Sequence, residues 1–122
     1  MKKILFIEDE FTLQKNMGEF LEKAGYKIVH ALDGEIGLSL ANKENPDLIL
    51  LDLILPTMSG FEVLEKLKED NATKNIPVII LTNLEESTDV EKSLKLGATT
   101  YLVKSDQNLD DVLKRIKETL KE

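Results

Sequence analysis

The sequence has no cysteine and no tryptophan, and it has only 3 prolines and 1 histidine among its 122 residues. The absence of cysteine excludes disulfides, thiolate metal sites and thiol redox chemistry. No apolar run is long enough to span a bilayer or to form the core of a signal peptide, so we expect a cytoplasmic protein without membrane insertion. Basic residues are also few: 16 against 23 acidic residues give a net charge of −7, which disfavours direct binding to nucleic acid.

The residues that are present suit a globular protein. A hydrophobic fraction of 42% and a charged fraction of 32% provide enough apolar surface to offset the entropy of the chain. A chain of 122 residues has the size of one domain with one core. We therefore expect residues 1–122 to form a single domain.

Short apolar runs alternate with segments of helical spacing along the whole chain. The runs cover residues 4–7, 26–29, 48–51, 78–81 and 101–103. Because they are apolar without alternation, they predict a parallel sheet with helices on both faces. Gly25 and Gly97 follow helical segments where a left-handed residue is needed, and the weakest predicted helix spans residues 35–42. The predicted fold is α/β, a doubly wound, flavodoxin-like (βα)₅ sheet with strand order 2-1-3-4-5.

Polar residues stand where the predicted strands end. They are Glu8, Asp9 and Glu10 after the first run, Asp52 after the third, Thr82 after the fourth and Lys104 after the fifth. The carboxyl ends of parallel strands share one edge of the sheet, and ligands of such folds bind at that edge. We therefore expect these side chains to converge on one site.

Several converging carboxylates need a cation, since like charges raise one another's pKa. All-oxygen ligands without histidine or cysteine favour Mg²⁺, with Mn²⁺ as an alternative. Ca²⁺ is less favoured, because the chain has no loop of regularly spaced Asp and Asn residues. A cation beside Asp52 makes phosphoryl transfer to that carboxylate feasible. Lys104 would neutralise a second phosphoryl oxygen, and the Thr82 hydroxyl would donate to a third.

These residues resemble the response regulator receiver family over the whole chain, in the manner of its single-domain chemotaxis regulators. Four segments carry the resemblance: residues 7–10 are similar to the family's acidic pair, residues 51–60 to its phosphoacceptor loop, and Leu81-Thr82 and residues 101–104 to its hydroxyl and lysine strands. All five functional positions occur in order. Such a joint match is far more specific than any one of the motifs.

The resemblance implies a role in phosphorelay signal transduction. Asp52 would take its phosphoryl group from a sensor histidine kinase or a phosphotransfer protein, and no enzyme activity beyond transfer to and hydrolysis from this residue is expected. Glu8 and Asp9 would bind Mg²⁺ together with Asp52, and Ile54 would add its backbone carbonyl. Thr82 and Tyr101 would switch the face formed by the fourth helix, fifth strand and fifth helix, which would bind a downstream protein target.

Two features depart from the usual pattern of the family, and two others bear on the lifetime of the phosphoryl group. Ser105 replaces the proline that often follows the lysine with a cis bond, which leaves the geometry of the Lys104-Ser105 peptide open. Asn83 follows Thr82 where the family usually has a smaller residue, so the resemblance does not predict how open the pocket is. In the family, the residues at the positions of Ile54 and Leu84 flank the path of the water that hydrolyses the phosphoaspartate. Because both are apolar in this chain, slow self-dephosphorylation is predicted.

Three other functions are alternatives to a phosphoryl-accepting receiver. A Mg²⁺-dependent phosphohydrolase typically has a second Asp two residues after the nucleophile, where this chain has Ile54. A flavin-binding electron carrier needs a phosphate loop after the first strand, where Glu8-Asp9-Glu10 would repel the phosphate. A receiver-like interaction module without phosphoacceptor activity stays open as an alternative.

Three further residues are less informative. His30 is expected to be structural or exposed, since it follows the second predicted strand away from the site. Phe11 and Met17 could form part of a kinase-docking surface, but Met17 is expected in the core because it lies on an apolar stripe.

Overall fold

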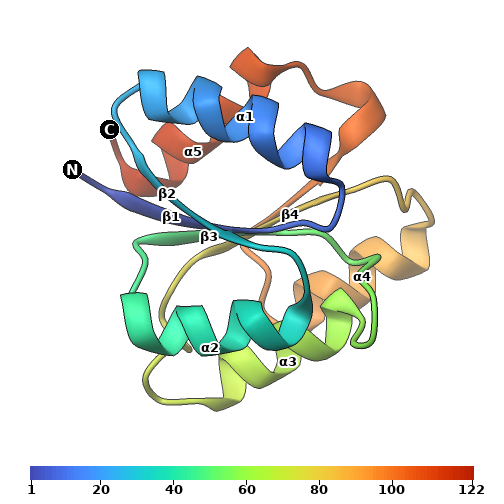
Figure 1. Cartoon of the computed structure of the whole chain (residues 1–122). Helices are drawn as coiled ribbons and strands as arrows, with labels where there is room; N and C mark the ends of the chain where they lie inside the picture. Colours follow the sequence, from blue (N-terminus) through green and yellow to red (C-terminus); the bar gives the residue numbers. More distant parts are fainter.

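Five parallel strands form the centre of the molecule in the computed structural model, which describes all of residues 1–122 (Figure 1). The strands are β1 Lys3–Ile7, β2 Lys27–Ala31, β3 Leu48–Leu51, β4 Val78–Thr82 and β5 Thr100–Val103. Their order is β2-β1-β3-β4-β5, which confirms the predicted topology.

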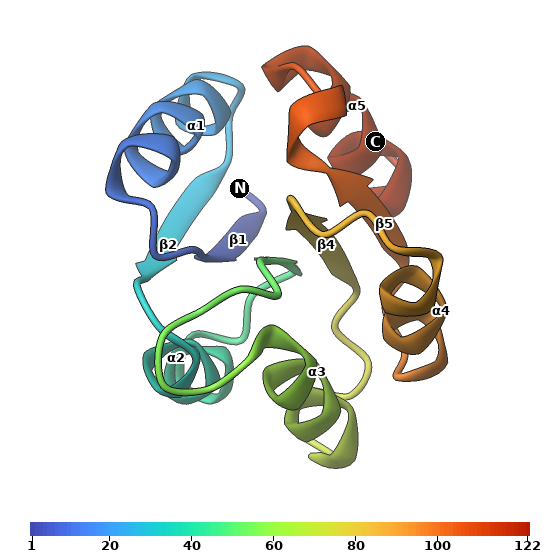
Figure 2. The same cartoon turned by 90° about the vertical axis from the view of Figure 1, so that its right-hand side faces the viewer.

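Helices cover both faces of the sheet. They are α1 Phe11–Lys23, α2 Gly34–Glu44, α3 Gly60–Glu69, α4 Ser87–Lys95 and α5 Leu109–Leu120, with a short 3₁₀ helix, η1, at Lys104–Asp106. Helices α1 and α5 lie on one face, and α2, α3 and α4 lie on the other (Figures 1 and 2). The molecule therefore has three layers.

The core is divided by the sheet into two clusters. Successive strand residues point to opposite faces, so Phe6 and Leu50 pack under α1 and α5 while Leu5 and Leu51 pack under α2 and α3. All four of these side chains are completely buried. This two-sided burial is the reason that the strands read as continuous apolar runs.

The carboxyl ends of the strands lie at one edge of the sheet. Ile7 at the end of β1 is in register with both Ala31 of β2 and Leu51 of β3. Thr82 at the end of β4 is in register with Val103, the last residue of β5. The residues that immediately follow these strands are thereby brought to a common rim.

The helix boundaries follow the expected local signals. Gly25 and Gly97 have φ of +105° and +110°, as predicted for the residues that end two helices. The weakly predicted helix is present as α2, and the Asp33 side chain caps it by accepting from the Ile36 N–H. Gly37 is needed there for close packing, because a Cβ at this position would overlap Ile7 of β1.

Strands β1, β4 and β5 are each one residue longer than predicted, and β2 differs from its prediction at both ends. Strand β2 spans Lys27–Ala31 and not residues 26–29, so His30 lies within the strand and does not follow it. Tyr26 is apolar and buried, which is typical of a strand residue, but it precedes the first residue of β2 that pairs with β1. His30 is exposed and Met17 is in the core, as predicted. No helix is both long and apolar enough to cross a membrane.

Candidate functional site

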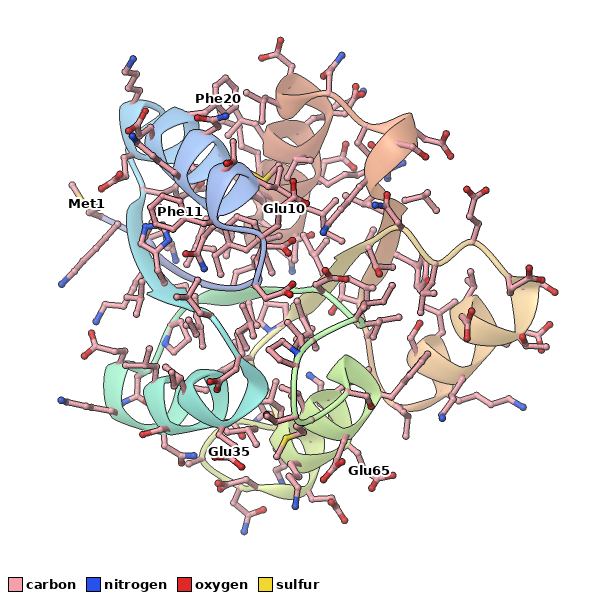
Figure 3. All side chains as sticks on the ribbon, turned by 45° about the vertical axis from the view of Figure 1, so that its right-hand side comes forward. Met1, Glu10, Phe11, Phe20, Glu35 and Glu65 are labelled. Atoms are coloured by element: carbon pink, nitrogen blue, oxygen red, sulfur yellow. The ribbon has the colours of Figure 1, made fainter.

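Three carboxylates from two neighbouring strand ends meet at the rim. Glu8 and Asp9 follow β1, and Asp52 follows β3 directly. Glu10, the next residue of the loop that leads from β1 into α1, is labelled in Figure 3. One oxygen from each of the three lies within 4.8 Å of the others. Glu8 and Asp52 are buried, at 0% and 4% exposed, whereas Asp9 is open to solvent. The predicted convergence is therefore present.

Lys104 is the cation of this cluster. It begins η1 immediately after β5, and its Nζ lies 2.6 Å from Oε1 of Glu8 and 2.9 Å from Oδ2 of Asp52. Burial alone would lower the pKa of Lys104, but its contacts with Glu8 and Asp52 outweigh burial and raise the pKa above its ordinary value. The ammonium is thus held in its charged form.

Glu8 is the least satisfied member of the cluster. Burial, with a smaller contribution from the charge of Asp52, raises the pKa of Glu8 to about 7 even though Lys104 and the Glu10 N–H oppose this shift. Its Oε1 is close to Lys104 but accepts no hydrogen bond of regular geometry. Lys104 is the only cation that pairs with these three carboxylates, and it contacts Glu8 and Asp52 but not Asp9. Three negative charges against one positive charge leave a net charge that a divalent cation could neutralise. The donor set of carboxylate oxygens fits Mg²⁺.

Ile54 and Thr82 border Asp52. The N–H of Ile54 donates to Oδ1 of Asp52 at 3.2 Å, and the Ile54 side chain is 54% exposed. Thr82 is completely buried at the end of β4, the strand beside β3. Both residues are at the rim where the sequence places them.

Tyr101 lies on β5 and is hydrogen-bonded to the loop after β4. Its hydroxyl donates to the carbonyl of Leu84 at 2.8 Å. Burial is the main cause that raises the pKa of Tyr101 to about 12, and the charges of Asp89 and Asp52 add to it. Asn83 is exposed and Leu84 is partly buried. The Lys104-Ser105 peptide is trans, since the chain has no cis bond.

Two residues that were given no role from the sequence also shape the site. A Cβ at Gly60 would overlap the backbone of Asp52 and Leu53, and the Gly60 N–H donates to the Leu53 carbonyl at 2.8 Å. Gln14 is buried on α1 and donates to backbone carbonyls at the ends of β1 and β2. A glycine at a helix start and a polar residue beside apolar helix positions were the available signals.

Comparisons with known proteins agree with this geometry. Residues 4–117 match the family model of the response regulator receiver domain. The DNA-binding dual master transcriptional regulator RpaA of Synechocystis is 38% identical over 121 residues, which are 99% of this chain and 50% of RpaA. Protein PilH of Pseudomonas aeruginosa is 36% identical over 104 residues, which are 85% of this chain and 86% of PilH.

The fold agrees as well. The crystal structure of a CheY-like response regulator receiver domain protein from Methanospirillum hungatei superposes with a TM-score of 0.93 at 31% identity, covering 99% of this chain and 94% of that one. The chain spans half the length of RpaA and most of PilH. The family match over almost the whole chain, the shared fold and the acidic pocket show that this protein belongs to the response regulator receiver domain family, the signalling modules of two-component phosphorelays.

Proposed function

We propose that Asp52 accepts a phosphoryl group from a phosphohistidine of a sensor histidine kinase or a phosphotransfer protein. The observation that carries this proposal is the placement of Asp52, which shares a cluster with Glu8 and Asp9 and has its Oδ2 held by Lys104. Mg²⁺, or Mn²⁺ in its place, would be held by Glu8, Asp9, Asp52 and the backbone carbonyl of Ile54. A bound cation supplies charge neutralisation for the anionic donor and the anionic acceptor.

The chain's own residues account for the remaining steps. A carboxylate oxygen of Asp52 forms the bond to phosphorus as the bond from phosphorus to the donor's imidazole nitrogen breaks, and the imidazole leaves. Lys104 already contacts Asp52 and would pair with a phosphoryl oxygen after transfer. The buried hydroxyl of Thr82 would donate to another oxygen. Lys104 needs little movement for its role, because its Nζ already lies 2.9 Å from Oδ2 of Asp52.

The readout of phosphorylation is proposed to run through Thr82 and Tyr101. Movement of Thr82 toward the phosphoryl group would disturb the adjoining loop, whose Leu84 carbonyl accepts the hydrogen bond from Tyr101. Release of that bond would let the ring change position and would alter the face formed by α4, β5 and α5. A downstream protein is the expected partner of this face, since a net charge of −7 disfavours direct nucleic-acid binding.

Three further properties belong to the proposed function: the extent of the domain, its location in the cell and the lifetime of the phosphoryl group on Asp52. We propose that residues 1–122 form one receiver domain that acts in the cytoplasm. All five strands belong to one sheet, which supports a single domain. Hydrolysis of the phosphorylated Asp52 is proposed to be slow, because the side chains of Ile54 and Leu84 cannot hydrogen-bond an attacking water.

Incubation with acetyl phosphate and Mg²⁺, followed by intact-mass measurement, tests the central proposal. We expect the chain to gain one phosphoryl group, which hydroxylamine removes as it does from an acyl phosphate. Asp52→Asn should gain none, while Asp47→Asn, at an exposed residue just before β3, should behave like the parent. An unchanged mass of the folded parent would favour the alternative of a receiver-like interaction module that does not accept phosphate.

A further inference from the structure

The side chain of Gln14 joins three backbone segments beneath the acidic loop. Its Nε2 lies 3.3 Å from the carbonyl oxygen of Phe6 in β1, 3.1 Å from that of Glu8 and 3.0 Å from that of Ala31 at the end of β2. Only 5% of the residue is exposed. An amide nitrogen has two hydrogens, so this group serves three acceptors and has no donor to spare.

The bond to Glu8 is the one that matters for the site. The Gln14 side chain provides the only hydrogen bond to the Glu8 carbonyl, while the Glu8 N–H donates to the Ala31 carbonyl at 3.0 Å. The backbone N–H of Gln14 also donates to the Glu10 carbonyl at 3.0 Å. The acidic loop is therefore attached to α1 on both sides of Asp9.

From this geometry we infer that Gln14 is a positioning residue that sets the affinity of the acidic cluster for a divalent cation. This inference rests on the proposed function, because it concerns the same site. Carboxylates bind a cation more tightly when their backbone is fixed before binding, and groups that orient metal ligands typically contribute about 10- to 100-fold to metal affinity. Gln14 fixes the backbone that carries Glu8, and through it the loop that carries Asp9.

Gln14→Met tests the inference, since methionine has a similar volume and no donor. We expect its dissociation constant for Mn²⁺, measured from the free-ion signal in electron paramagnetic resonance, to rise about tenfold. With acetyl phosphate, the half-saturating Mg²⁺ concentration should rise by the same factor, while the rate at saturating Mg²⁺ stays close to that of the parent. Met17→Ala, which opens a cavity on the same helix, should lower stability and leave Mn²⁺ affinity unchanged.

A measurement on the parent keeps the inference open to refutation even if Gln14→Met does not fold. The side-chain amide of Gln14 should exchange slowly with solvent, and its ¹H–¹⁵N resonances should shift in step with Mg²⁺ occupancy. The inference would be overturned if folded Gln14→Met bound Mn²⁺ with the affinity of the parent. It would also be overturned if the resonances of the Gln14 side-chain amide did not shift when Mg²⁺ is added to the parent. The proposed function fails separately, if the parent binds Mn²⁺ at these acids but takes no phosphoryl group on Asp52.

Discussion

At the scale of single residues, the apolar side chains of Ile54 and Leu84 bear on the proposed lifetime of the phosphoryl group on Asp52. Ile54 is 54% exposed and follows Asp52 by two residues, and Leu84 follows Thr82 by two residues on the neighbouring strand end. Neither side chain can accept or donate a hydrogen bond. A water that attacks the phosphorylated carboxylate would therefore receive no hydrogen bond from either side chain, which leaves part of the activation barrier in place.

We predict that polar substitutions at these two positions shorten the lifetime of the phosphorylated protein. Ile54→Asn and Leu84→Glu would each supply a hydrogen-bonding group beside the attacking water, and an increase in decay rate of about tenfold corresponds to a barrier lowered by about 1.4 kcal/mol. Loss of the phosphorylated mass after removal of acetyl phosphate measures the rate. Ile36→Asn, at another exposed apolar residue, is the control. Equal decay in all variants and the parent would refute the proposed roles of Ile54 and Leu84.

The two tyrosines, Tyr26 and Tyr101, provide a pH dependence that can be read directly, because the chain has no tryptophan. Burial is the main cause that raises the pKa of each to about 12, and Tyr26 also donates to the Glu122 carboxylate at 2.5 Å. The folded pKa lies above the unfolded value of about 10. The corresponding stabilisation is therefore complete below pH 10 and is lost as the pH rises to about 12.

We expect the phenolate absorbance of the folded chain to rise with a midpoint near pH 12, and that of the urea-unfolded chain near pH 10. The difference in unfolding free energy between the parent and Tyr26→Phe should shrink across the same interval. Comparison with this variant removes the contribution of lysines that titrate in the same range. Ionisation of both tyrosines near pH 10 in the folded protein would contradict the buried environment assigned to them.

Much of the architecture was predictable at the scale of elements, because β1, β3 and β4 are buried on both faces and the helices carry apolar stripes. Strand β3 was placed to the residue, while β2 was shifted because Tyr26 is apolar and buried without pairing. The site residues were predictable because they follow strand ends. Gln14 and Gly60 were not, since their roles depend on contacts between segments that only the folded chain brings together.

The contact between α3 and the loop after β3 leads to a prediction for Gly60. Gly60→Ala would place a methyl group against the backbone of Asp52 and Leu53, so we expect a loss of unfolding free energy of about 1 to 3 kcal/mol and slower phosphorylation of Asp52. Urea denaturation and the acetyl phosphate reaction measure the two effects. Gly25→Ala is a matched control, because its φ of +105° makes alanine unfavourable while the space around it is open.

Gly25→Ala should therefore lose stability and keep the phosphorylation rate of the parent. If the two alanine variants lose stability and activity in the same proportion, the effect of Gly60→Ala comes from general destabilisation. A loss of activity confined to Gly60→Ala would show that the start of α3 sets the position of Asp52.

The acidic cluster also affects the molecule as a whole, because it exists only in the folded state. Glu8, Asp9 and Asp52 lie far apart in an unfolded chain, so Mg²⁺ that binds them stabilises the native state selectively. At a Mg²⁺ concentration of about 100 times the dissociation constant, the added stability is about 2.7 kcal/mol. A gain of this size in a domain of this length corresponds to a rise in melting temperature of roughly 10 °C.

We therefore predict that saturating Mg²⁺ raises the melting temperature of the parent, and that a chelator reverses the rise. Asp9→Asn removes the exposed carboxylate of the cluster and should abolish most of the shift, whereas Asp47→Asn should retain it. Na⁺ at equal ionic strength separates specific binding from screening of the net charge of −7. If Asp9→Asn and the parent gained the same stability from Mg²⁺, the cation would be acting on the surface charge of the whole molecule and not at this cluster.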